Sequence, residues 1–132
     1  MPIGAFISSA ELMSGFSSNP VLGHMNTFGG NAVCVAAAQA CLDVIIRESL
    51  PARALQIGQT ISEELVHPLI KELRVCGAMC ALDLGSEELN MKVIKSCIEH
   101  GIITDWFLFC STSLRIAPPL VISDGELKSS LR

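Results

Sequence analysis

The sequence predicts an α/β chain in two pieces: residues 1–50, the tail of a larger domain, and residues 51–132, a compact α+β unit. Two observations predict this fold class. Strand-like and helix-like patterns alternate along the chain. The composition also changes near Leu50 and Pro51, from small apolar residues with few charges to amphipathic segments with paired charges. We therefore expect only the second piece to fold on its own.

The first piece contains a short strand, a long loop and a helix. Residues 3–8 form an apolar run that predicts a strand edge, and residues 9–11 could begin a brief helix. Residues 14–30 are rich in Gly, Ser, Asn and Pro without any period, which predicts a functional loop. Residues 31–49 are good helix formers with apolar side chains on nearly every side, so we expect a buried helix.

The second piece begins with a helix and a strand pair. Pro51 marks the start of an amphipathic helix that runs to about Lys71. His67 and Pro68 could disturb this helix near its end. Its expected apolar face consists of Leu55, Ile61, Leu65 and Leu69. Residues 73–84 predict either a buried strand pair or one bent strand, with Gly77 at the bend.

The remaining elements are predicted from caps and stop signals. Ser86 caps a helix that ends at Gly101 and buries one apolar face, made of Leu89, Val93, Ile94 and Cys97. Strands are expected to start at residues 102–103 and to span residues 114–116, where two prolines stop the second strand. Ser123 and Glu126 form a capping box for the last helix.

Composition disfavours several classes of partner and site. The net charge of −4 at a pI near 5.2, without a basic cluster, argues against nucleic acid or an anionic membrane as a partner. The longest apolar stretch, residues 32–46, is shorter than the roughly 20 residues of a membrane span. Residues 1–10 lack the basic start of a secretory signal, so a cytoplasmic location is expected.

The six cysteines predict neither a disulfide framework nor a metal site. They form no CxxC pair, and no histidine lies at the spacing that a zinc site uses. Each has apolar neighbours, which favours reduced, buried thiols that act as small hydrophobic residues in a reducing compartment. These cysteines are Cys34, Cys41, Cys76, Cys80, Cys97 and Cys110.

Two groups of residues are candidates for binding chemistry. Thr27 offers a hydroxyl, Gly29 and Gly30 allow backbone amides to approach a ligand, and the following helix N-terminus favours an anion such as phosphate. A simple glycine turn with a helix cap is the alternative. Arg115 lies in an otherwise apolar strand, which we expect to be buried, and it needs a carboxylate partner there. The partner is either a substrate or an acid such as Asp105 in a structural salt bridge.

The same residues resemble two signatures of the class III, pyridoxal-phosphate-dependent aminotransferases. The signatures are Thr-Phe-Gly-Gly-Asn at 27–31 and Leu-Arg-Ile-Ala-Pro-Pro-Leu at 114–120, and a Pro-Ile-Gly-Ala strand starts at Pro2. The resemblance extends from Pro2 to about Glu126. The chain departs from the family where Arg-Val-Cys-Gly, residues 74–77, replaces the usual Arg-Gly-x-Gly, and where Ala32 replaces a frequent proline.

The resemblance implies a part of a fold-type I transferase. Residues 1–50 would be the C-terminal end of the large domain that binds pyridoxal 5'-phosphate, and residues 51–132 the small C-terminal domain. Thr27, Gly29 and Gly30 would bind the cofactor, whereas Arg115 and Asn26 would contact the substrate. The family's Schiff-base lysine lies a few residues before the strand that here begins at Pro2. No catalytic residue is therefore expected in this chain, and we expect the chain alone to be inactive.

The implied reaction is the transfer of an amino group from an amino-acid or amine donor to a 2-oxo acid, in a homodimer with a shared active site. Two alternatives stay open: a non-catalytic binding or dimerisation module, and a mutase, decarboxylase or racemase on the same fold. Acetylornithine, ornithine, 4-aminobutyrate and lysine are all possible donors.

Overall fold

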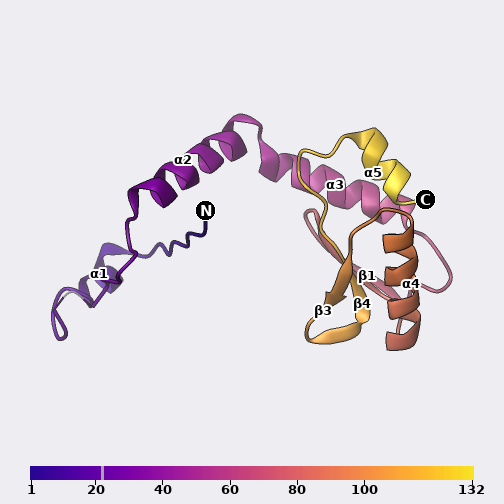
Figure 1. The fold of residues 1–132 in the computed structure, drawn as a ribbon, viewed down its shortest axis with the longest axis horizontal. Coiled ribbons are helices and arrows are strands. Elements are labelled where there is room, and N and C mark those ends of the chain that lie inside the picture. The colour runs from indigo at the N-terminus through magenta and orange to yellow at the C-terminus, as the bar shows by residue number, and fades with distance from the viewer. Residues whose placement is uncertain (22) are drawn as a thin grey trace. The chain divides into compact units, whose positions relative to one another are not determined.

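The chain folds as two units, Met1–Glu48 and Ser49–Arg132, in a computed structural model that describes residues 1–21 and 23–132 (Figure 1). The elements in chain order are α1 (Ala10–Ser14), α2 (Ala32–Arg47), α3 (Leu50–Glu64), β1 (Glu72–Cys76), β2 (Met79–Asp83), α4 (Glu87–Glu99), β3 (Asp105–Phe107), β4 (Cys110–Ile116) and α5 (Asp124–Ser130).

The first unit contains two helices joined by a loop. The brief helix predicted after Ser9 is α1, and the Leu12 N–H donates to the Ser9 hydroxyl at 3.3 Å. The loop predicted over 14–30 is confirmed from Gly15 onwards, except that Leu22 lies outside the described residues. The strand predicted at 3–8 is wrong, because this segment is irregular and exposed. A strand needs a neighbour for its backbone hydrogen bonds, and no strand pairs with it among the described residues.

Helix α2 forms where the sequence predicts it, but the predicted burial is wrong. None of its 16 residues is buried, and Val33, Leu42 and Ile46 keep between 49% and 67% of their surface exposed. Apolar side chains become buried only against another surface. Within the described residues of its own unit, α2 has no helix or strand packed along it.

The second unit is a four-stranded antiparallel sheet with helices packed on one face. The strand order is β1-β2-β4-β3, and β1 and β2 form the predicted strand pair. Leu73, Leu82 and Leu114 align across three strands and lie in a core cluster with Ile94 of α4. Because side chains alternate between faces, the intervening residues of each strand point to the opposite face, where no helix of residues 49–132 packs.

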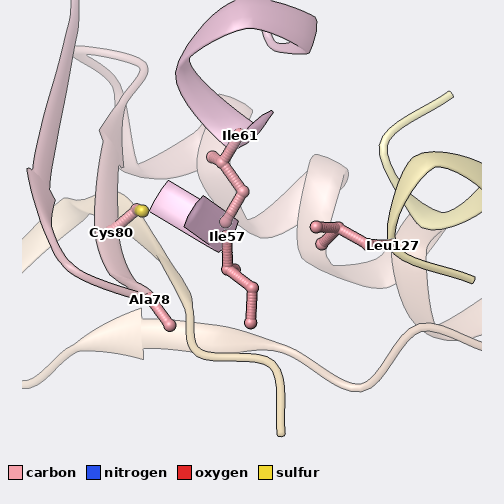
Figure 2. Close-up of a cluster of buried hydrophobic side chains, with 5 residues drawn as sticks. All are labelled: Ile57, Ile61, Ala78, Cys80 and Leu127. Carbon is pink, nitrogen blue, oxygen red and sulfur yellow. The ribbon is translucent and has the colours of Figure 1, made fainter. Parts of the chain in front are cut away.

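Helix α3 supplies the second core cluster. Figure 2 shows Ile57 and Ile61 of α3 beside Cys80, Ala78 and Leu127. The predicted apolar face was wrong in part, because Leu55 and Leu69 are exposed. The helix also ends at Glu64 instead of near Lys71. The residue before a proline disfavours helical backbone, so Pro68 prevents the helix from continuing through His67.

Local signals correctly predict the remaining elements. Ser86 caps α4 by accepting from the Leu89 N–H at 3.3 Å, and Gly101 follows the helix with φ +84°. The capping box of Ser123 and Glu126 is present in α5. Two boundaries differ: β3 begins at Asp105 instead of at residues 102–103, and β4 already begins at Cys110.

The cysteines are all free thiols, as predicted, but their burial differs. Cys80 is buried, whereas Cys41 and Cys76 are exposed. Cys76 lies at the end of β1 on the face away from the helices, and Cys41 lies on the uncovered helix α2. In the part of the chain that the structure describes, no group of three or more His, Cys, Asp or Glu residues is arranged to hold a metal ion. No described helix is long and apolar enough to cross a membrane.

Because α3 and the β1–β2 turn are in close contact, a glycine-to-alanine substitution in α3 should lower the stability of the second unit. A Cβ atom at Gly58 would lie 2.2 Å from the Gly77 carbonyl oxygen and 2.9 Å from Cγ1 of Val75. Gly58→Ala should therefore destabilise the second unit by about 1–3 kcal/mol, although alanine favours a helix. The free energy of urea unfolding measures this effect. Gly125→Ala is the control, since its Cβ would meet nothing within 4 Å. Equal stability of Gly58→Ala and the parent chain would contradict the packing.

Candidate functional site

The segment from Asn26 to Asn31 is a tight double turn before α2. The Gly29 N–H donates to the Asn26 carbonyl at 3.2 Å, and the Asn31 N–H donates to the Phe28 carbonyl at 3.3 Å. Gly30 has φ +69°, a left-handed conformation that favours glycine. A Cβ at Gly29 would lie 3.2 Å from Oδ1 of Asn26. Both glycines therefore have a structural reason to be present in this turn.

Several hydrogen-bond donors of this turn have no partner among the described residues. They are the Thr27 hydroxyl and the backbone N–H groups of Thr27, Phe28 and Gly30. These residues are exposed, and a group of donors of this kind can bind an anion such as phosphate. The contribution expected from the helix N-terminus is smaller, because Oδ1 of Asn31 already accepts from the Val33 and Cys34 N–H groups at 3.1 and 3.2 Å.

Arg115 lies in β4 on the sheet face without helices. The expectation of a buried strand position is wrong for this residue, because its side chain is 45% exposed. Strand alternation explains the difference: Leu114 points to the helices and Arg115 points away from them. The alternative partner Asp105 is present, with its Oδ2 at 2.5 Å from Nη2 of Arg115. The Thr104 hydroxyl donates to the Arg115 carbonyl at 2.6 Å.

The salt bridge leaves much of the Arg115 guanidinium available. Of its nitrogens, Nη2 alone has a hydrogen-bond partner in the described part of the chain, and a guanidinium has five N–H donors in a planar fork. An incoming carboxylate could therefore bind Arg115 without first displacing Asp105. The structure thus contains the salt bridge and still permits the carboxylate clamp.

A second polar group on this face was missed by sequence reasoning. Arg74 pairs through Nη1 with Glu72, and its Nη2 donates to the Ser113 hydroxyl at 3.2 Å. The hydrogen bond and charge of Glu72 raise the pKa of Arg74 above its ordinary value. The Cys110 sulfur lies 3.1 Å from the Ser113 hydroxyl, and hydrogen bonds from Ser113 and then Thr112 lower the pKa of that thiol.

This polar group could have been predicted only from the register of the strands. Arg74 aligns with Ala81, and Ala81 aligns with Arg115, so the three residues form one row on the face without helices. Alternation within a strand is visible in the sequence, but the pairing of β1 with β2 and of β2 with β4 is not. Of the candidate residues, Asn26, Thr27, Gly29 and Gly30 are brought together in one turn of the first unit. Arg115 belongs to the second unit.

Comparisons with known proteins match the whole chain. The family described as aminotransferase class-III matches residues 1–132. Ornithine aminotransferase 2 of Staphylococcus saprophyticus subsp. saprophyticus is 36% identical over 99% of this chain and 32% of its own length. The protein of the same name from Staphylococcus aureus (strain Mu50) is 34% identical over 98% of this chain and 32% of its own length. The chain therefore spans about a third of the length of these relatives.

Solved structures agree with the sequence match. Ornithine aminotransferase from Toxoplasma gondii has a TM-score of 0.73 and 32% identity over 83% of this chain and 27% of that protein. Acetylornithine aminotransferase from Elizabethkingia anophelis has a TM-score of 0.73 and 28% identity over 82% of this chain and 30% of that protein. The predicted fold class, part of a fold-type I transferase, is thereby confirmed. Because the family match covers every residue, this chain belongs to the class-III aminotransferase family.

Proposed function

We propose that this chain takes part in the pyridoxal-phosphate-dependent transfer of an amino group from an amino donor to a 2-oxo acid. The observation that carries the proposal is the turn at 26–31, in which the Thr27 hydroxyl and three backbone N–H groups have no partner among residues 1–21 and 23–132. Membership of the class-III family supports it. The related Toxoplasma gondii protein is described as having pyridoxal phosphate at partial occupancy in its active site. When bound, this cofactor supplies the electron sink for the transfer.

The first role of the chain is to hold the cofactor phosphate. The Thr27 hydroxyl and the nearby N–H groups would donate to phosphate oxygens, and the glycines at 29 and 30 leave the approach free of side chains. Asn26 would contact the substrate from the same turn, where its amide lies on the side of Gly29 on which a Cβ atom would stand. All of these groups bind and orient, and none of them needs to change its protonation state.

The second role is to orient the substrate through its carboxylate. Arg115 offers a planar fork that matches a carboxylate with two parallel hydrogen bonds. Asp105 holds one end of the guanidinium, which limits its rotation before the substrate arrives. A fixed guanidinium reduces the ordering that binding requires, and so it favours one orientation of the reacting amino group.

None of the four lysines, Lys71, Lys92, Lys95 and Lys128, is proposed as the covalent attachment point, and three of them have a carboxylate partner. Lys92, Lys95 and Lys128 lie within 2.7, 4.0 and 3.8 Å of the carboxylates of Glu88, Glu99 and Glu64. A lysine nitrogen that is engaged by a carboxylate is less available as a nucleophile than a free amine. The alternatives of a binding module, or of a mutase, decarboxylase or racemase, have no observation of their own in their favour.

The proposed assembly follows from the same family. Residues 1–50 would be the end of a large cofactor-binding domain and residues 51–132 a small domain, in a cytoplasmic homodimer with a shared active site. The exposed apolar side chains of α2 support this, because a surface of that kind is normally covered by other protein. The net charge of −4 supports the absence of a nucleic-acid or membrane partner.

A chimera tests the activity directly. Residues 1–132 would replace the segment that they match in Ornithine aminotransferase 2 of Staphylococcus saprophyticus. We expect the folded chimera to bind pyridoxal phosphate and to transfer the amino group of ornithine to a 2-oxo acid. A folded chimera that binds the cofactor without any transfer would favour the non-catalytic alternative instead.

Removal of the Thr27 hydroxyl should weaken the binding of pyridoxal phosphate to this chimera. Thr27→Val keeps the shape and removes the hydroxyl, whereas Thr27→Ser keeps the hydroxyl and serves as the matched control. A charge-assisted hydrogen bond is worth roughly 1.5–3 kcal/mol. The Kd for pyridoxal phosphate should therefore rise about ten- to hundredfold in Thr27→Val and little in Thr27→Ser. Fluorescence titration measures both values, and equal affinities of the two variants would remove Thr27 from the phosphate site.

Substitution of Arg115 distinguishes a role in substrate binding from a role in stability. Arg115→Lys keeps the charge and loses the planar fork, so the KM for carboxylate substrates should rise about tenfold or more. Its Tm should change little, because a half-exposed salt bridge contributes about 0–1 kcal/mol. Arg53→Lys is the control, since Arg53 joins α3 to Asp124 and to the Ile122 carbonyl. A lower Tm with unchanged KM in Arg115→Lys would make its salt bridge purely structural.

A further inference from the structure

We propose that Arg74 is a positioning residue for Arg115, which acts by tying β1 to β4 through the Ser113 hydroxyl. Arg74, Ala81 and Arg115 form one row across β1, β2 and β4 on the face without helices. The catalytic consequence rests on the proposed role of Arg115, but the positioning itself is a property of this chain and can be measured without any reaction.

The distance across the sheet limits how β1 and β4 can be connected. Backbone hydrogen bonds join only neighbouring strands, and β2 separates β1 from β4. Neighbouring strands lie about 4.8 Å apart, so β1 and β4 are roughly 10 Å apart and only a long side chain can connect them. Arg74 makes this connection, because its Nη2 donates to the Ser113 hydroxyl at 3.2 Å. Its Nη1 pairs with Glu72 on its own strand, which steadies the guanidinium.

Ser113 is unusually well buried for its position in the sheet. This residue has no exposed surface, although it lies on the face where no helix of residues 49–132 packs. Its hydroxyl has two partners, the Arg74 guanidinium at 3.2 Å and the Cys110 sulfur at 3.1 Å. A buried hydroxyl must keep its hydrogen bonds, and the charged donor is the stronger of the two partners. Arg74 therefore restrains Ser113 in one position.

The position of Ser113 affects Arg115 because both residues belong to β4. One residue of β4, Leu114, lies between them, so the side chains of Ser113 and Arg115 point to the same face of the sheet and are next to each other on that face. Arg115 is also held from the β3 side, by Thr104 at its carbonyl and by Asp105 at its guanidinium. Arg74 supplies the matching restraint from the β1 side. Together these contacts set the direction in which Arg115 leaves the sheet.

The test uses the complete 132-residue chain labelled with ¹⁵N. Nuclear magnetic resonance follows the Nε–Hε signal of Arg115 and the amide hydrogen exchange of residues 113–116. The variants are Arg74→Met, which keeps the stem and removes the donors, Ser113→Ala, and both together. Glu72→Gln is the matched control, because it weakens the pair on β1 and leaves the link to β4. Cys110→Ala removes the other partner of Ser113.

The proposal predicts a local and non-additive effect. Exchange at residues 113–116 should rise about tenfold in Arg74→Met and in Ser113→Ala, with broadening of the Arg115 signal. The double variant should equal the single variants, because both break the same link. Glu72→Gln and Cys110→Ala should change exchange there by less than about twofold.

Three results would overturn the proposal: unchanged exchange in Arg74→Met, equal acceleration in α3, α4 and β4, or additive effects in the double variant. Equal acceleration would mean that Arg74 only stabilises the unit as a whole. Because no cofactor or turnover enters this measurement, its failure is distinct from a failure of the proposed function, which the KM of Arg115→Lys reports.

Discussion

The close approach of α3 to the β1–β2 turn is the constraint on which the second unit depends. The backbone at Gly58 lies so near the Gly77 carbonyl that no Cβ fits between them. This approach allows the fully buried Ile57 and Ile61 to pack with Cys80 (Figure 2). The packing holds the β1–β2 hairpin against the helix, and β2 pairs in turn with β4. The row of Arg74, Ala81 and Arg115 lies on the opposite face of this same sheet.

Much of the secondary structure could be predicted because its signals act over a few residues. Ser86 and Ser123 cap their helices through N–H groups three positions away, so the cap is written in the local sequence. Gly77, with φ +57°, similarly identifies the turn between β1 and β2. The residues of the candidate phosphate site belong to the same category, since the turn at 26–31 is closed by hydrogen bonds between residues three apart. Its geometry is present in the structure, and its ligand is a proposal.

Most of the failed predictions of burial and pairing concern surfaces that are distant in sequence. Among the described residues, the apolar run at 3–8 pairs with no strand, and α2 has no helix or strand of its own unit packed along it, so the strand did not form and the helix is not buried. Periodicity indicates which side chains need cover, but it does not say what covers them. The exposure of Arg115 and the link from Arg74 to Ser113 depend on the pairing of separate strands. Asp105 could be named in advance only as one alternative partner, since its register with Arg115 is equally non-local.

The central claim is that this chain binds both the cofactor phosphate and the substrate carboxylate. The most direct measurement is a crystal structure of the chimera with pyridoxal phosphate and an unreactive carboxylic-acid analogue of the substrate. The account predicts a phosphate oxygen about 3 Å from the Thr27 hydroxyl, and the carboxylate of the analogue at the same distance from the Arg115 guanidinium. A phosphate held without Thr27, together with a carboxylate bound away from Arg115, would contradict it.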